Sequence, residues 1–161
     1  MPTPSAASVS AISWQCTAFD ELTPGDLYAA MQLRQRVFVV EQNCAYLDAD
    51  GMDRPSHHLL GWQVDGGRRR LVAYARLLPP RSKYAEPSIG RVVTDADVRG
   101  TGAGKALMIE AIRLVESLGW GSEIRIAAQM YLERFYEGFE FRRVTEPYQE
   151  DGIWHVDMRR G

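Results

Sequence analysis

The segment Arg99-Gly-Thr-Gly-Ala-Gly-Lys105 joins an apolar run, Ser88 to Thr94, to a strongly periodic run that extends from Lys105 to Leu118. This order predicts a strand, a glycine-rich turn and a helix that begins within the turn. Free backbone N–H groups converge at a helix N-terminus and carry partial positive charge. The three glycines allow successive amides to point into one concavity, and the two flanking cations add full charges. The turn therefore predicts the binding of a pyrophosphate.

The spacing of the glycines argues against two common phosphate-binding loops. A P-loop requires Gly-x-x-x-x-Gly-Lys-Ser/Thr, but here Arg99 replaces the first glycine and Ala106 the hydroxyl residue. A dinucleotide fingerprint requires Gly-x-Gly-x-x-Gly after the first strand of a βαβ unit, whereas this turn reads Gly-x-Gly-x-Gly past the middle of the chain. An ordinary strand–helix turn without a ligand is the remaining alternative.

We expect one folded domain over residues 11–161, preceded by a flexible N-terminal lead over residues 1–10 that is rich in Ala, Ser and Pro. Thr23 is the expected N-cap of a first helix, in which Arg34 and Arg36 are expected to be solvent-exposed. The other expected helices are 105–118 and 131–138, and the expected strands are 12–19, 58–64, 71–78, 88–94, 123–128, 141–144 and 153–158. The order β-α-β-β-β-α-β-α-β-β predicts a mixed α/β fold (α+β, with helices on a mixed sheet).

Composition argues against several classes of protein. The net charge of −2 does not indicate a nucleic-acid-binding surface. Two cysteines, Cys16 and Cys44, are too few for a disulfide framework or a cysteine metal site, and Asp48-x-Asp50-Gly51 lacks the later ligands of an EF-hand. No apolar run is long enough to span a membrane, and the N-terminal residues do not read as a signal peptide. We therefore expect a cytoplasmic protein that binds no metal, membrane or nucleic acid.

Several separated motifs together resemble one superfamily. Arg99, Gly102 and Gly104 fit the Arg/Gln-x-x-Gly-x-Gly/Ala signature of the GNAT acetyltransferases, and Phe135-Tyr-Glu-Gly-Phe139 fits their second motif. The stretch Arg34-x-Arg-Val-Phe-Val-Val-Glu-Gln42 resembles the ElaA branch of that superfamily, as does the ending from Glu146 to His155. The resemblance extends over about residues 12 to 160 and implies the GNAT fold in the element order given above.

The resemblance also implies acetyl-CoA as the acyl donor and assigns residues to it. In the superfamily, the pantetheine arm of the cofactor enters between two strands that diverge at their C-terminal ends. In this chain they correspond to the strand before the glycine turn and the next strand along the sequence. Gln129 takes the place of an Asn that many members use to bind pantetheine, and Phe135 is a core aromatic beside the cofactor. The implied cofactor-binding residues are Val92, Val93, Arg99, Gly100, Thr101, Gly102, Ala103, Gly104, Lys105, Gln129 and Phe135.

Two residues are candidates for the proton transfers of direct acyl transfer to an amine. A phenol is a credible proton donor to a departing thiolate, and Tyr136 matches the position of the superfamily's candidate acid. Packing in the core is the alternative role for that ring. Glu41, which follows the first helix, is the candidate base. His57, His58 and His155 could also take a proton, but a structural role is the stronger expectation for each.

Asp48, Asp50 and Asp53 follow Glu41 within a few residues, and only Arg54 stands close behind them. Such an acidic loop is expected to bind the acceptor and to favour a cationic amine over an anionic one. Solvated turn-capping carboxylates are the alternative.

The sequence thus predicts an N-acetyltransferase that moves an acetyl group from acetyl-CoA to a primary amine. An idle acyl-CoA-binding or sensor module of the same fold is the competing hypothesis, since fold does not fix function. The identity of the acceptor and the oligomeric state stay open, a homodimer being one option.

Overall fold

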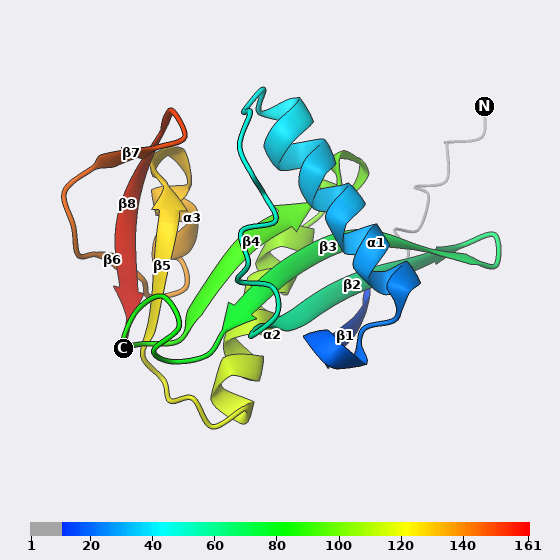
Figure 1. The fold of residues 1–161 in the computed structure, drawn as a ribbon, viewed down its shortest axis with the longest axis horizontal. Coiled ribbons are helices and arrows are strands. Elements are labelled where there is room, and N and C mark those ends of the chain that lie inside the picture. Colours follow the sequence, from blue (N-terminus) through cyan, green and yellow to red (C-terminus); the bar gives the residue numbers. More distant parts are fainter. Residues whose placement is uncertain (1–10) are drawn as a thin grey trace, which may run out of the picture.

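The computed structural model describes residues 11–161, so the expected N-terminal lead lies outside the described residues. The chain forms two sheets, and the first has the strand order β1-β2-β3-β4 with antiparallel neighbours (Figure 1). Gly66 and Gly67 both have positive φ and make the tight turn between β2 and β3. The strands of this sheet are β1 (Ser13–Ala18), β2 (His57–Asp65), β3 (Arg68–Leu78) and β4 (Ser88–Thr94).

The second sheet is built around the last strand of the chain. Strand β8 pairs antiparallel with the three others, with β5 along most of its length and with the two short strands near either end. A two-residue turn, Asp151 and Gly152, both at positive φ, connects β7 to β8. The strands of this sheet are β5 (Ile124–Gln129), β6 (Arg142–Arg143), β7 (Tyr148–Glu150) and β8 (Ile153–Arg160).

The helices are α1 (Pro24–Arg34), α2 (Ala103–Ser117) and α3 (Glu133–Glu137), and a π-helical turn, Gln35–Glu41, extends α1. The hydroxyl oxygen of Thr23 accepts a hydrogen bond of 3.1 Å from the backbone N–H of Asp26, which confirms the predicted N-cap. None of the described helices has the length and apolar character that crossing a membrane requires.

The two long helices cover opposite faces of the first sheet, as Figure 1 shows. Side chains alternate along β2 and β3, so that Leu60 and Tyr74 face α1 while Leu59 and Ala75 face α2. The larger core cluster lies on the α2 side and continues to the second sheet, where Phe141 and Met158 are completely buried. Burial of both faces explains why these strands read as continuous apolar runs in the sequence.

Strands β4 and β5 lie next to each other at their beginnings and then diverge (Figure 1). They are joined at the base, where the backbone N–H of Arg125 donates to the carbonyl oxygen of Pro87 at 3.0 Å. Beyond that point they belong to different sheets, so the edge of β4 that faces β5 has no strand ladder. A β-bulge bends β4 in the same region, because Arg91 and Val92 together stand opposite one residue of β3, and Arg91 has a φ of +49°.

The predicted mixed α/β fold and the predicted order of elements are confirmed, with one strand missed. Strand β7 was not predicted, because a three-residue strand leaves no periodic pattern in the sequence. The helix that follows the glycine turn begins at Ala103 and therefore includes two residues that were expected to lie before it.

Candidate active site

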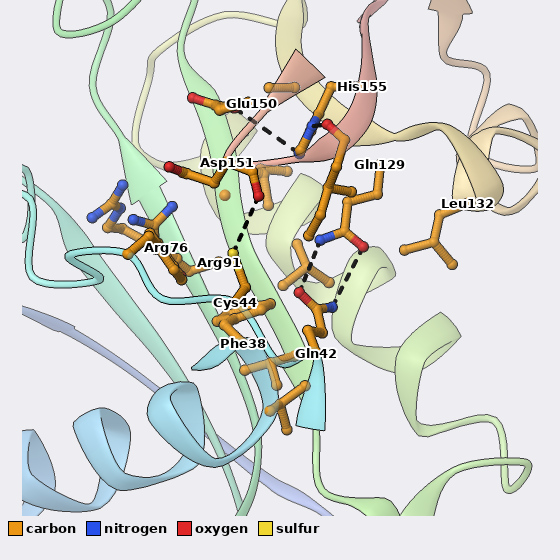
Figure 2. A pocket seen from close by; sticks show the side chains of 18 of the residues that line it. Phe38, Gln42, Cys44, Arg76, Arg91, Gln129, Leu132, Glu150, Asp151 and His155 are labelled. Atoms are coloured by element: carbon orange, nitrogen blue, oxygen red, sulfur yellow. Dashed lines mark hydrogen bonds and ion pairs between the residues drawn. The ribbon is translucent and has the colours of Figure 1, made fainter. Parts of the chain in front are cut away.

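A cavity of about 860 Å³ opens where β4 and β5 diverge. The segment that follows α1 forms one wall and the turn between β7 and β8 forms another, as Figure 2 shows. Val92 and Val93 of β4 and Ala127 of β5 lie along its floor. The charged side chains that line the cavity are Glu41, Asp50, Arg76, Lys83, Arg91, Arg99, Glu150 and Asp151.

The glycine turn continues from the cavity into the first turn of α2. Arg99 lines the cavity, whereas Gly100 to Lys105 do not. Gly100 and Gly102 have φ values of +78° and +89°, and no heavy atom lies within 4 Å of a Cβ built on either residue. The first hydrogen bond within α2 runs from the N–H of Ala106 to the oxygen of Gly102, and no side chain caps the helix. The N–H groups of Ala103, Gly104 and Lys105 therefore have no partner within the helix.

Tyr136 belongs both to the core and to the cavity. Its side chain is 7% exposed, and its ring packs edge-on against Phe135, with the two centroids 5.2 Å apart. It also lines the cavity, and none of the hydrogen bonds between described residues involves its hydroxyl group. Burial raises the pKa of Tyr136, so the phenol is neutral near pH 7 and has a proton to donate. The two roles that the sequence left open are thus compatible.

Phe135 lies beside the glycine turn instead of lining the cavity. Its ring would be 3.8 Å from a Cβ built on Gly104, an ordinary packing distance. Phe135 also packs edge-on against Phe139, so the ring is held between the start of α2 and the residues that follow α3.

Two hydrogen-bonded bridges connect the segment after α1 with the second sheet. The side-chain amides of Gln42 and Gln129 exchange hydrogen bonds of 3.4 and 3.3 Å, and the Sγ of Cys44 donates to the backbone oxygen of Asp151 at 3.4 Å (Figure 2). Gln129 is the last residue of β5, where the sequence placed a pantetheine ligand. Its amide is therefore at the expected position but already has a protein partner, Gln42.

Glu41 also has a partner. Its Oε2 accepts a hydrogen bond of 2.8 Å from the guanidinium group of Arg99, which donates in addition to the backbone oxygen of Thr94. The candidate base and the candidate phosphate-binding arginine thus form an ion pair with each other at the edge of the cavity.

The expectation of an unopposed acidic loop is wrong, because three arginines neutralise its aspartates. Arg34 was expected to be exposed but is completely buried, and it contacts Asp48 at 2.8 Å and Asp53 at 2.7 Å. Arg76 pairs with both Asp50 and Asp53, at 2.8 and 3.1 Å.

Arg91, at the bulge of β4, completes this network. It contacts Asp48 at 2.8 Å and Asp50 at 3.3 Å. Burial raises the pKa of Asp53, but hydrogen bonds and charges from Arg34 and Arg76 outweigh burial and hold this pKa below its usual range. Of the three aspartates only Asp50 lines the cavity, so the geometry gives Asp48 and Asp53 a structural position.

His58 is buried and has a partner on each ring nitrogen. Its Nε2 lies 2.9 Å from the backbone oxygen of Asp53, which can only accept, so Nε2 carries the proton and the hydroxyl of Tyr74 donates to Nδ1 at 2.6 Å. Burial lowers the pKa of His58, and the charges of Arg34 and Arg76 lower it further. The structural role expected for this histidine agrees with its position.

Sequence reasoning missed some residues of the cavity and undervalued others. Gln42 ends a motif of the resemblance but was given no role, and Arg91 belongs to no motif. Glu150 and Asp151 lie in the hairpin whose first strand was not predicted. His155 was expected to be structural, but it lines the cavity. The alternation along β8 was the one available signal, since it places His155 and Ile153 on the same face of the strand.

Comparison with known proteins gives one consistent answer. A family model described as an acetyltransferase (GNAT) domain matches residues 48–160. A protein of the UPF0039 group from Synechocystis is 42% identical over 147 residues, which cover 91% of this chain and 94% of the relative. The protein ElaA of Escherichia coli is 42% identical over 151 residues, which cover 92% of this chain and 96% of ElaA.

Solved structures agree with these relatives. An acyl-CoA N-acyltransferase from Pseudomonas aeruginosa aligns with a TM-score of 0.86 and 41% identity over 94% of this chain and all of that chain. The crystal structure of E. coli ElaA aligns with a TM-score of 0.84 and 40% identity over 93% of this chain and 99% of its own.

A CoA-based acyl donor fits the residues that are present. Among the described residues, the edge of β4 has no ladder partner and the first amides of α2 have no hydrogen-bond partner. Tyr136, whose hydroxyl makes no hydrogen bond to a described residue, lines the cavity. These features match the sequence motifs, the family model and the relatives. The chain therefore belongs to the GNAT acetyltransferase family, within which it is similar to ElaA.

Proposed function

We propose that this protein transfers an acetyl group from acetyl-CoA to a primary amine, directly and within a ternary complex. The observation that carries the proposal is the unengaged hydroxyl of Tyr136, which lines a cavity bounded by the unpaired edge of β4. Backbone groups of Val92 and Val93 would pair with the pantetheine arm as an added strand does. A backbone N–H near Val93 would stabilise the oxyanion that forms when the amine attacks.

In this proposal, the phosphates of acetyl-CoA bind at the start of α2. The free N–H groups of Ala103, Gly104 and Lys105 would bind the pyrophosphate, helped by the dipole of α2. Arg99 would donate to a phosphate oxygen through the guanidinium N–H groups that its contacts with Glu41 and Thr94 leave free. Tyr136 would protonate the departing thiolate.

The charges that line the cavity change where the acceptor amine is expected to bind. The residues that line the cavity include four acids and four basic side chains, so the cavity as a whole has no strong preference for cations. Asp50 is paired with Arg76, and Glu41 with Arg99. Glu150 and Asp151 at the turn between β7 and β8 are the remaining acids, and we propose that this turn, instead of the loop of Asp48 to Asp53, attracts the ammonium group.

Thiol-release kinetics test the proposed activity. The purified protein is mixed with acetyl-CoA and with a panel of polyamines, aminoglycosides, amino acids and lysine-containing peptides, and free CoA is measured. Saturable release with one class of amine is the expected result. Tight binding of acetyl-CoA by calorimetry, without turnover on any amine of the panel, would contradict the proposal and support an acyl-CoA-binding module instead.

A further inference from the structure

His155 lies in the middle of the second sheet and faces the cavity. It stands directly opposite Gln129 in the antiparallel pair of β8 and β5. Residues opposite each other in such a pair point to the same face of the sheet, and Gln129 lines the cavity. Figure 2 shows the imidazole ring next to the Gln129 side chain, on the wall across from the segment that follows α1. The residue is 9% exposed and lines the cavity.

The hydrogen bonds of the ring define its tautomer. Its Nδ1 lies 2.8 Å from the backbone oxygen of Ile153, and a carbonyl oxygen can only accept. The neutral ring therefore carries its proton on Nδ1 and presents a lone pair on Nε2. The Nε2 atom is 4.0 Å from Oε2 of Glu150, and Tyr148 stacks on the ring with centroids 5.9 Å apart. A basic nitrogen is thus held in one orientation beside a carboxylate.

Glu41 is less well placed for the same task. Its carboxylate accepts a hydrogen bond from Arg99 at 2.8 Å, whereas Nε2 of His155 is hydrogen-bonded to no described residue. An imidazole also titrates near neutral pH, which is the range in which a general base for an amine is most effective.

We propose that Nε2 of His155 is the general base that removes a proton from the acceptor ammonium, and that the carboxylate of Glu150 attracts the ammonium and stabilises the imidazolium that results. This inference rests on the proposed function and adds the base that the reaction requires. The other titratable side chains that share this part of the cavity are Cys44, Tyr131, Tyr136 and Asp151.

The proton and electron balance is complete without a further reactant. One ammonium proton moves to Nε2, and the freed nitrogen lone pair forms the new C–N bond to the acyl carbon. The C–S bond breaks, its electron pair stays on sulfur, and the phenol of Tyr136 protonates the thiolate. The second nitrogen proton restores the phenol through water, and His155 releases its proton to solvent. The net products are the amide, the free thiol and one proton.

The substitution His155→Asn removes the base while retaining a side-chain N–H close to the position of Nδ1. We expect kcat/KM at pH 7 to fall roughly 10²–10⁴-fold, the usual contribution of a general base, with unchanged affinity for acetyl-CoA in calorimetry. In the wild type, kcat/KM should fall at acidic pH, because a protonated imidazole cannot act as the base. That acid limb should disappear in His155→Asn, and the residual rate should rise steadily with pH as free amine accumulates.

His57→Asn is the matched control, because His57 packs against Trp120 and does not line the cavity. It should retain both the wild-type rate and the acid limb. If His155→Asn retains the limb, or if Glu41→Gln abolishes it while His155→Asn does not, the inference is overturned and the proposed function stands. If the wild type releases no thiol with any amine, the proposed function fails and the inference fails with it.

A spectroscopic measurement tests the tautomer without turnover. The chain has three histidines, so ¹⁵N chemical shifts of the imidazole rings can be assigned with the two variants above. In its neutral form, His155 should show a protonated Nδ1 and an unprotonated Nε2. A protonated Nε2 in the neutral ring would contradict the proposal, since that nitrogen could not then act as a base.

Discussion

Arg34 shows how a single charged residue is accommodated in the interior of this protein. Removing a guanidinium from water is costly, and only well-placed carboxylates and hydrogen bonds offset that cost. Arg34 meets this requirement with Asp48 and Asp53, and its guanidinium lies 5.6 Å from the centre of the Tyr74 ring. The network thus connects the end of α1 to the loop before β2 and to β3, next to the cavity.

Arg34→Met should be strongly destabilising, because it leaves Asp48 and Asp53 buried with one cation fewer. We expect urea denaturation to show a loss of about 3–5 kcal/mol in the free energy of unfolding. Arg36→Met is the matched control, since Arg36 is half exposed and pairs with Asp95 at 3.0 Å. It should cost about 1 kcal/mol or less. Equal losses in both variants would show that the buried ion pairs of Arg34 stabilise the protein no more than the exposed ion pair of Arg36.

Tyr136→Phe separates chemistry from packing. The ring and its contacts with Phe135 and Phe141 are retained, and the hydroxyl has no protein partner to lose among the described residues. If Tyr136 is the general acid, kcat should fall roughly 10²–10⁴-fold while acetyl-CoA affinity changes little. Thermal unfolding provides the control. Normal kcat combined with a lowered melting temperature would assign Tyr136 to the core alone.

Among the secondary-structure elements, the glycine turn and the first turn of α2 together form the proposed phosphate-binding site. Gly102 has a positive φ, a conformation that favours glycine. Gly104 is helical, and a Cβ built on it would lie 3.8 Å from the Phe135 ring, an ordinary packing distance. Neither backbone strain nor a clash with a Cβ therefore requires glycine at position 104 in the protein alone.

Gly104→Val should consequently spare the fold and weaken CoA binding. We expect calorimetry to show a loss of about 2 kcal/mol or more, the value of one or two hydrogen bonds to a charged group. Ala106→Val is the control on the same helix, because the N–H of Ala106 is already bonded to Gly102 and is not free for phosphate. Unchanged affinity in a folded Gly104→Val protein would remove the turn from the CoA site.

At the scale of the whole molecule, two sheets meet at the base of β4 and β5 and open toward the cavity. The core on the α2 side is continuous across both sheets, whereas the opening itself is bridged by polar contacts, the Gln42–Gln129 pair and the Cys44–Asp151 bond. Such bridges exchange partners at little cost, which suits a site that must admit a ligand.

The stability of the whole protein should fall on acidification. The pKa of His58 is lowered mainly by burial, so unfolding takes up a proton as the pH falls below the ordinary histidine value of about 6.5. Asp53 acts in the same direction at lower pH, because its pKa in the folded protein is below its unfolded value and its ion pairs are lost on protonation. The free energy of unfolding should therefore be highest above about pH 6.5 and decrease below it.

Urea denaturation at a series of pH values measures this dependence. His58→Gln should remove the part of the slope that lies between the unfolded and folded pKa values of His58 and leave the lower part, which belongs to carboxylates such as Asp53. A wild-type stability that stays constant from pH 7 to pH 5 would contradict the assignment.

Features that depend on neighbours along the chain could be predicted from the amino-acid sequence. The strand–turn–helix of residues 88–117 follows from apolar runs and from glycines that permit positive φ, and the start of α1 follows from Thr23 and Pro24. The position of Tyr136 after β5 follows from the short motif around it. These signals are local, so a linear reading contains them.

Which charged and polar side chains meet depends on the folded arrangement and could not be predicted from the sequence. Arg34, Arg76 and Arg91 come from three different elements. Their convergence on the aspartates of one loop turned an expected acidic surface into a neutral network with a buried centre at Arg34 and Asp53. The pairing of Gln42 with Gln129 and the orientation of His155 toward the cavity likewise depend on how the second sheet packs against the first. Charge and tautomer are set by partners in space, which the order of residues alone does not specify.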